Sequence, residues 1–317
     1  MLSRMSVLLL THPMSHRHVT PPGHPERVAR IEAVDRVLSR PVYEALARAE
    51  APAADDGTLA LAHAPHYLDE IRHSVPTEGW TALDADTHIC PESLTAARHA
   101  AGACVAAVEA VVSGAHRAAF CAVRPCGHHA EHDKAMGFCL FDNVAIGALH
   151  ALERLGLSRV AVVDFDVHHG NGTQDILWAE SRALFASSHQ LPLFPGTGNA
   201  HETGVGNIVN APLQPMSGSA EMRRAYEGTI LPALDAFRPE LILISAGFDA
   251  HIDDPLANLM WETEDFAWVT RALCRLANAH CGGRVVSTLE GGYDLDALAG
   301  GVAAHLDALI DMTETAP

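Results

Sequence analysis

The sequence predicts an α/β protein whose central parallel sheet carries helices on both faces. Short apolar runs typical of buried strands alternate along the chain with longer segments of helical spacing. The runs lie at 6–10, from 118 onward, and at 160–163, 184–187, 241–245 and 284–289. Four of them lead directly into polar residues, and ligands of open α/β sheets bind beyond the carboxyl ends of the strands. We therefore expect these polar segments to meet in one crevice.

The segments between these runs are expected to be helices. Val28 to Leu38 has apolar residues at helical spacing, and Pro25 stands where such a helix can begin. Further helices are expected at 92–112, 143–155, 220–237 and 263–279. The chain of 317 residues is 48% hydrophobic and has no stretch of linker composition. We therefore expect a single domain over residues 1–317, with disorder only from Thr313 onward.

The composition argues against some classes of function. A net charge of -18 disfavours a nucleic-acid-binding protein, which needs a basic face, and suits a cationic substrate such as a lysine side chain or a polyamine. The 7 cysteines form no CxxC pair and are expected to be reduced, packed thiols of a cytoplasmic protein. No apolar run approaches the roughly 20 residues that cross a bilayer, so no membrane association is expected. The oligomeric state, including a homo-oligomer, is left open.

The stretch VAVVDFDVHHGNGTQ at 160–174 carries the strongest chemical signal. Its apolar start predicts a strand buried on both faces, and the alternation of side chains along a strand would point Asp164, Asp166 and His168 the same way. Two carboxylates and an imidazole are costly to bury unless a cation compensates them. We interpret the stretch as a metal site, although any one of these residues alone would more often be a cap or a solvated loop residue.

Three other segments that follow apolar runs supply further polar residues. The segment RPCGHHA places His128 beside His129, and the two can share a site only if the backbone turns, as the preceding proline and glycine permit. The segment AGFDA presents Asp249. The segment EGGYD presents Tyr293 after two glycines, a position that fits a buried core tyrosine less well than a residue of the site.

Taken together, the motifs RPCGHHA, DFDVHHGNGTQ, SAGFDA and LEGGY resemble the zinc-dependent histone deacetylase superfamily in their order and spacing. That group includes class II deacetylases, bacterial histone-deacetylase-like amidohydrolases, acetylpolyamine amidohydrolases and acetoin-utilisation proteins. The resemblance runs from His24 in HPER to Tyr293 and implies a three-layer α/β/α arginase–deacetylase fold. One departure is Cys126, where the family usually has proline, and we expect it to be tolerated.

By this resemblance, one catalytic zinc ion would be held by Asp166, His168 and Asp249. Three protein ligands leave a coordination place for water and substrate. Tyr293 would donate its hydroxyl to the oxyanion that develops on the substrate, and the glycines before it would form the turn that places its ring. The resemblance also implies a structural potassium ion, with ligands drawn from Asp164, Asp166, His168, Ser187 and Ser188.

The resemblance also implies roles for the two adjacent histidines. His129 would be the general base that later protonates the leaving amine, and His128 would give electrostatic help. Asp164 is expected behind His128 and Asn171 behind His129. A carboxylate partner raises the basicity of an imidazole more than an amide does, so the two rings are expected to differ.

Five residues are expected to contact the substrate. Phe138 and Phe194 match the two aromatic walls of the family's narrow acyl-lysine tunnel, and Gly137 adjoins them. Asp86 is expected at the rim, where it would accept a hydrogen bond from the substrate backbone, and Asp84 is the alternative. Capping the helix that follows is the default role of either carboxylate.

The fifth of these residues bears on the choice of substrate. Leu256 occupies the position at which polyamine-selective relatives carry a glutamate that attracts a second ammonium group, so leucine favours acetyl-lysine peptides. Arg27 of HPER is expected either to line an internal channel for acetate or to form an ion pair at a helix start.

The predicted function is that of a zinc-dependent amidohydrolase that removes acetyl groups from amines, foremost from acetyl-lysine in proteins or peptides. A deacetylase of acetylpolyamines or of another small acylated amine is the enzymatic alternative. A non-catalytic acyl-lysine binding module is disfavoured, because the expected ligands, both histidines and Tyr293 are all present. A two-metal ureohydrolase is disfavoured by the single-metal ligand set.

Overall fold

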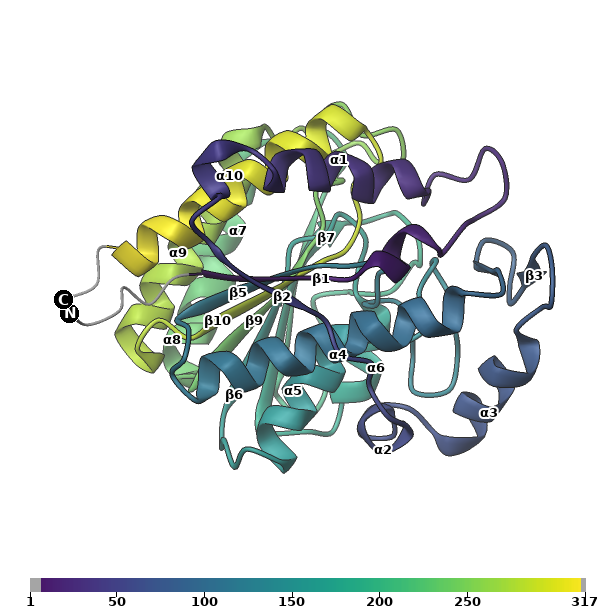
Figure 1. Cartoon of the computed structure of the whole chain (residues 1–317). Coiled ribbons are helices and arrows are strands. Elements are labelled where there is room, and N and C mark those ends of the chain that lie inside the picture. The colour runs from purple at the N-terminus through teal and green to yellow at the C-terminus, as the bar shows by residue number, and fades with distance from the viewer. Residues whose placement is uncertain (1–6, 315–317) are drawn as a thin grey trace.

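An eight-stranded sheet forms the centre of the computed structural model, which describes residues 7–314 (Figure 1). The strand order is β2-β1-β5-β10-β9-β6-β7-β8, and every pairing within it is parallel. Its strands are β1 (Val7–Thr11), β2 (Ala47–Glu50), β5 (Ala118–Ala122), β6 (Val160–Asp164), β7 (Ala183–Gln190), β8 (Ile208–Leu213), β9 (Leu241–Ala246) and β10 (Val285–Leu289). The antiparallel pair β3 (Thr81–Ala82) and β4 (His88–Ile89) stands apart from this sheet.

Helices cover both faces of the sheet, as the alternating sequence pattern predicted. They are α1 (Val28–Leu38), α2 (Asp56–Leu59), α3 (Pro65–Ser74), α4 (Ser93–Val112), α5 (Asn143–Glu153), α6 (Asn171–Leu177), α7 (Ser219–Ala225), α8 (Leu231–Phe237), α9 (Thr263–Cys281) and α10 (Leu295–Glu314). Helices α1 and α7 to α10 pack on one face, and α2 to α6 pack on the other. Figure 1 shows α1 and α10 above the strands and α4 and α5 below them.

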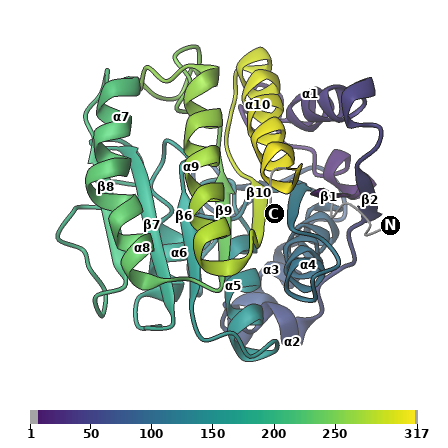
Figure 2. The same cartoon turned by 90° about the vertical axis from the view of Figure 1, so that its left-hand side faces the viewer.

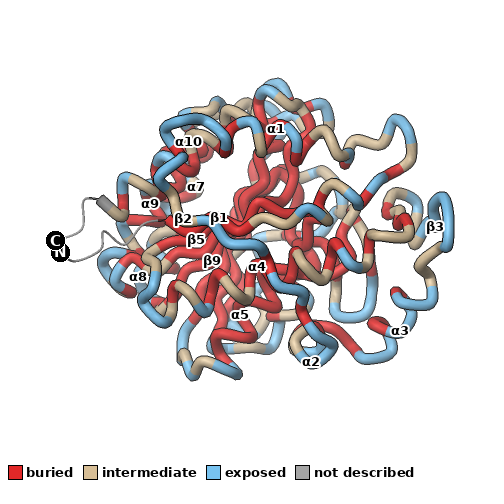
Figure 3. The backbone as a smooth tube through the Cα atoms, in the orientation of Figure 1, coloured by how far each residue is buried: buried red, intermediate tan, exposed pale blue. Residues whose placement is uncertain are grey.

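Neighbouring residues of each central strand contribute to different cores. In β6, Val163 belongs to the core under α9 and α10, whereas Val162 belongs to the core over α4 and α5. Because side chains alternate along a strand, a strand that is apolar throughout fits a sheet buried on both faces. The central strands accordingly form the buried centre in Figure 3. The predicted three-layer α/β/α fold is confirmed.

The two edges of the sheet, which Figure 2 shows on opposite sides, were not predicted from the sequence. The edge strand β2 is largely exposed, and the edge strand β8 contains Pro212, so neither has the continuous apolar pattern of the central strands. Helix α1 begins at Val28, three residues after Pro25. The helix predicted at 220–237 is interrupted by a π-helical segment, Tyr226–Ile230, between α7 and α8.

Helix α10 was also missed, and it corrects the prediction for the end of the chain. Thr313 lies in this helix and donates a hydrogen bond to the carbonyl of Ile310, so the disorder predicted from Thr313 is wrong for that residue. Residues 315–317, and Ser6 of the first predicted strand, lie outside the described residues. All 7 cysteines are free and buried, as predicted. Within residues 7–314, the helices are too short or too polar to span a membrane.

The topology brings the four polar segments together. Strands β5, β10, β9 and β6 are consecutive in the sheet and run in the same direction. Their carboxyl ends therefore lie side by side, and the registers pair Asp164 with Ser245 on one side and with Ser187 on the other. The segments that follow these strands meet in one place, as the sequence predicted.

Candidate active site

The three predicted metal ligands lie together at this edge of the sheet. Asp166, His168 and Asp249 are buried, and one ligand atom from each lies within 4.8 Å of the others. Strand β6 ends at Asp164, so the alternation of a strand does not orient Asp166 and His168, and that part of the sequence argument was wrong. Backbone hydrogen bonds orient Asp166 instead, because the N–H of His168 donates to its Oδ1 and the N–H of Gly291 donates to its Oδ2, both within 2.9 Å.

The cluster has the charge and the space that a cation site requires. The Nδ1 atom of His168 lies 3.1 Å from Asp166 and 3.2 Å from Asp249. Burial alone would lower the pKa of His168, but the hydrogen bonds to these carboxylates raise it to about 10. Burial and the charge of Asp166 raise the pKa of Asp249 to about 7. A Cβ atom at Gly247 or Gly291 would collide with these carboxylates, so glycine keeps space for them.

The nature of the donor atoms suits a zinc ion. Two carboxylates and one imidazole form a three-ligand set that leaves a place open, which is the pattern of catalytic rather than structural zinc sites. A bound divalent cation would also compensate the two buried carboxylates, which share a single imidazole. The residues present therefore fit zinc.

His128 and His129 share this site because the backbone turns before them. Their ring centroids are 4.0 Å apart. The Nδ1 atom of His128 lies 2.9 Å from Oδ2 of Asp164, and the Nδ1 atom of His129 lies 2.7 Å from Oδ1 of Asn171, so both predicted partners are in place. The turn itself is held by Glu290, whose Oε2 accepts a hydrogen bond from the N–H of His128 at 3.2 Å.

The two rings differ in electrostatics as their partners predict. Burial alone would lower the pKa of His128, but the charges of Asp164 and Asp166 raise it well above its ordinary value. Burial and the nearby charge of His128 lower the pKa of His129 well below its ordinary value. The surroundings thus favour the charged form of His128 and the neutral form of His129, and a neutral imidazole can accept a proton.

Tyr293 is held in place by its backbone and by an arginine that the sequence analysis missed. Its N–H donates to Oδ2 of Asp254 at 2.7 Å, and the guanidinium of Arg30 lies 5.0 Å from its ring centroid. Arg30 donates to the carbonyls of Glu290 and Gly292, each at 2.5 Å, and so clamps the EGGY turn. Gly292 has a φ of 123°, which only glycine adopts readily.

The prediction that placed Arg27 in an internal channel is wrong. Arg27 is exposed, whereas Arg30 is fully buried. Arg30 lies one helical turn after Glu26 and pairs with it at 3.0 Å, and this i,i+4 spacing is the signal that could have identified it.

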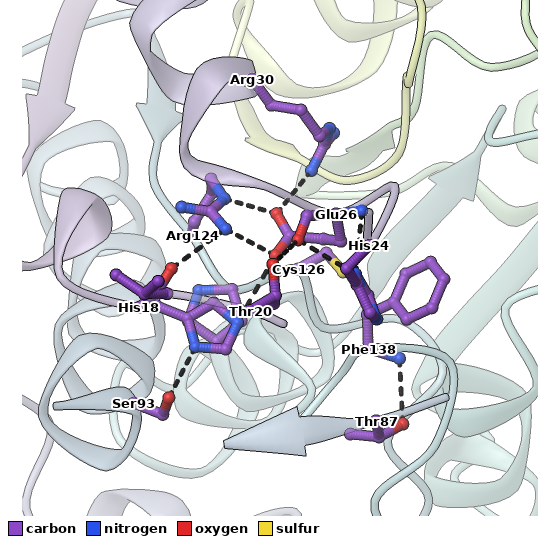
Figure 4. A network of polar contacts seen from close by, with 12 residues as sticks. His18, Thr20, His24, Glu26, Arg30, Thr87, Ser93, Arg124, Cys126 and Phe138 are labelled. Carbon is purple, nitrogen blue, oxygen red and sulfur yellow. Dashed lines mark hydrogen bonds and ion pairs between the residues drawn. The ribbon is translucent and has the colours of Figure 1, made fainter. Parts of the chain in front are cut away.

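Glu26 is the centre of a buried charge network that sequence reasoning also missed (Figure 4). Its carboxylate pairs with both Nε and Nη2 of Arg124, the latter at 2.6 Å, and lies 3.4 Å from Nε2 of His18. Arg124 in turn donates to the carbonyls of Ser15 and His18. Burial alone would raise the pKa of Glu26, but Arg124 and His18 hold it well below its ordinary value. The network attaches the loop at 12–27 to the segment that carries the two histidines.

A pocket of about 230 Å³ opens onto these groups. It is lined by Asp86, His129, Gly137, Phe138, His168, Leu193, Phe194, Leu256 and Tyr293. All five residues predicted to contact substrate are among them, and Leu193 is an addition that no sequence signal marked. The walls enclose the reacting groups, because the Phe194 ring lies 5.1 Å from that of His129 and the Phe138 ring lies 6.0 Å from that of Tyr293.

The rim contains Asp86 rather than Asp84. The Oδ1 atom of Asp84 accepts hydrogen bonds from the N–H groups of Asp86 and Thr87 and stabilises the turn between β3 and β4. Neither carboxylate caps α4, whose N-cap is Glu92, so the default helix-cap role is wrong for both. Thr87 supports the adjacent wall, because its hydroxyl oxygen accepts a hydrogen bond from the N–H of Phe138 at 3.1 Å.

The residues expected to bind potassium also lie close together. Asp164 pairs in register with Ser187, at the ends of two adjacent strands. The Ser187 hydroxyl lies 2.9 Å from Nδ1 of His189, and the Ser188 hydroxyl lies 3.0 Å from the hydroxyl of Tyr226. A potassium ion bound near them stays a prediction.

Known proteins resemble this chain in sequence and in structure. The histone deacetylase domain family matches residues 24–309. The chain is 34% identical to type-2 histone deacetylase 2 of Dictyostelium discoideum, over 98% of this chain and 21% of that protein. It is 41% identical to the histone deacetylase-like amidohydrolase of Pseudomonas aeruginosa, over 77% of this chain and 65% of that protein. The solved HD domain of HDA15 superposes with a TM-score of 0.92 at 32% identity, covering 98% of this chain and 89% of that one.

Proposed function

This chain belongs to the histone deacetylase family and is therefore a hydrolase of amide bonds, and we propose that it removes acetyl groups from lysine side chains with the help of one zinc ion. The observation that carries the proposal is the cluster of Asp166, His168 and Asp249 beside a pocket that His129 and Tyr293 also line. These three ligands would hold the ion. When bound, the ion polarises a substrate carbonyl and makes water nucleophilic at neutral pH.

His129 moves the protons in the proposed reaction. With Nδ1–H donated to Asn171, its Nε2 is free to take the proton from the attacking water. The same nitrogen then gives that proton to the departing amine. The low pKa of His129 supports this role, because the ring is neutral before the reaction begins.

Tyr293 and His128 stabilise the charge that develops during the reaction. The hydroxyl of Tyr293 donates a hydrogen bond to the developing oxyanion, and the Arg30 clamp keeps its ring oriented in advance. His128, held cationic by Asp164, contributes positive charge beside the reacting groups without giving up its proton.

The pocket lining supports acetyl-lysine as the substrate. The rings of Phe138 and Phe194 offer apolar surface to a chain of methylene groups, and Asp86 can accept a hydrogen bond from the substrate backbone at the rim. Leu256 also lines the pocket, so no carboxylate at that position attracts the second ammonium group of a polyamine. These features favour a lysine side chain within a peptide.

The test compares kcat/KM of the zinc-loaded protein on an acetyl-lysine peptide and on acetylated polyamines, with metal-depleted protein as the control. We expect activity that depends on zinc and is higher on the peptide. Higher kcat/KM on polyamines would contradict the proposed substrate. Equal activity of zinc-loaded and metal-depleted protein would contradict the role of the metal.

A further inference from the structure

Beside the pocket lies a second group of side chains that can bind a metal, formed by Cys126, Cys139 and Glu290. The two sulfur atoms are 3.4 Å apart, and a carboxylate oxygen of Glu290 lies within 4.8 Å of both. All three residues are buried, with exposures of 3%, 0% and 0%. Phe138 packs against the two cysteines, and Figure 4 shows Cys126 near that ring. The proposed mechanism uses none of the three as a reacting group.

Each of these residues belongs to a different segment of the active site. Cys126 lies two residues before His128, Cys139 directly follows Phe138, and Glu290 begins the EGGY turn. A cation bound by all three would connect the EGGY turn to two segments that lie far earlier in the sequence.

An unpaired oxygen of Glu290 gives independent evidence that this group can bind a cation. Oε2 of Glu290 accepts hydrogen bonds from the N–H groups of Gly127 at 2.7 Å and His128 at 3.2 Å. Oε1 is buried and has no hydrogen-bond partner among residues 7–314. An unpaired carboxylate oxygen destabilises a folded protein, and a cation beside it would remove that cost.

From these contacts we propose that Cys126, Cys139 and Glu290 form a second metal site, for a thiophilic divalent cation of the zinc type. In a tetrahedral site with Zn–S bonds of about 2.3 Å the two sulfurs lie about 3.8 Å apart, so this pair needs to open by only about 0.4 Å. On binding, each thiol loses its proton to solvent and its sulfur bonds to the cation, with no change of oxidation state. A water molecule can fill the fourth position.

Ligand chemistry distinguishes this site from the first one. Asp166, His168 and Asp249 offer only oxygen and nitrogen, whereas the second group offers two sulfurs. Cobalt replaces zinc in sites of both kinds, and only a site with thiolate ligands gives a thiolate-to-cobalt charge-transfer band. Absorption by cobalt-loaded protein therefore reports the second site separately from the first.

The experiment titrates metal-depleted full-length protein with Co²⁺ under a phosphine reductant. We expect two Co²⁺ per chain and a thiolate charge-transfer band in the near ultraviolet. Cys126→Ser and Cys139→Ser should each lose the band and one equivalent of cobalt. Cys274→Ser removes a buried thiol in α9, away from the site, and should retain both.

Three results would overturn this inference. The first is a single Co²⁺ per chain without the band, and the second is a band that survives Cys126→Ser. The third is a Cys126–Cys139 disulfide, detected by mass spectrometry, in a protein that still gives no thiolate band after the disulfide is reduced.

The variant Asp249→Ala separates the two sites. It should lose the Co²⁺ ion that is bound at the first site, which has no sulfur ligands, and it should keep the thiolate band of the second site. A failure of the proposed catalytic site would thus be distinguishable. Far-ultraviolet circular dichroism confirms that each variant is folded.

Discussion

Replacing Tyr293 by phenylalanine tests the proposed reaction most directly. The change removes one hydroxyl and leaves the ring, its contact with Arg30 and the backbone hydrogen bond to Asp254 in place. Because Tyr293 is only 8% exposed, its hydroxyl acts where water competes little for the oxyanion. Loss of one such donor costs about 2.7–4 kcal/mol of transition-state stabilisation, so kcat should fall by about 100- to 1000-fold. KM should change little, because the hydroxyl acts mainly in the transition state.

The free energy of unfolding, unlike kcat, should hardly change in Tyr293→Phe. Among the described residues, the Tyr293 hydroxyl makes no hydrogen bond, so its removal should leave stability within about 0.5 kcal/mol. Tyr43 is the matched control, because its hydroxyl donates to Oδ1 of Asp307 at 2.8 Å, far from the pocket. Tyr43→Phe should lower stability by about 1–2 kcal/mol and leave kcat unchanged.

Steady-state kinetics on an acetyl-lysine peptide, zinc content per chain and urea unfolding together check this pair of variants. A Tyr293→Phe protein that binds zinc and keeps kcat within about threefold of the parent would refute the oxyanion role. Equal losses of kcat in both tyrosine variants would show that the effect is one of general destabilisation.

Three further predictions concern the metal, the substrate and acid stability. Asp249→Ala should lower the zinc content by about one equivalent per chain relative to the parent and abolish turnover, as measured by atomic absorption and peptide assay; unchanged zinc content and activity would contradict the ligand assignment. Leu256→Glu should shift kcat/KM toward acetylated polyamines by about fivefold, since one attractive charge pair at a partly exposed position is worth about 1 kcal/mol; an unchanged ratio would remove the selectivity argument. Burial lowers the pKa of His305 to about 3. As pH falls below about 6.5, this histidine therefore binds a proton in the unfolded chain but stays neutral in the folded protein. The free energy of unfolding should then decrease as pH falls from about 6.5 toward 3. His305→Gln should therefore lose less stability than the parent between pH 6.5 and 4.5, by up to about 1.4 kcal/mol per pH unit, and identical acid profiles in urea unfolding would contradict this.

The sequence predicted the convergence of the site because that convergence depends on topology. Once β5, β6, β9 and β10 are recognised as parallel strands, His129, Asp166, Asp249 and Tyr293 must follow their carboxyl ends. The aromatic walls were predicted by resemblance alone, because Gly137 and Phe138 lie in an irregular loop where both have positive φ. No periodic pattern describes such a loop.

What the sequence did not predict depends on side chains that meet across long separations. Arg30 reaches carbonyls of the EGGY turn 260 and 262 residues away, and no local pattern in the sequence links the two segments. The pairing of Cys126 with Cys139 was missed for a different reason. Their spacing matches no metal or disulfide motif, and both lie in the irregular segment between β5 and α5.

The network around Glu26 bears on where this protein can be shortened. The region matched by the family starts at residue 24, but Arg124 donates its hydrogen bonds to the carbonyls of Ser15 and His18, upstream of that point. A chain trimmed to the matched region would also lose β1, which lies between β2 and β5 inside the sheet. The buried guanidinium would then lose these two carbonyl acceptors and keep only the carboxylate of Glu26, just before the two histidines. The smallest unit that can be expressed with an intact site therefore includes the first strand, and truncation or fusion at the amino terminus should leave β1 and the loop after it untouched.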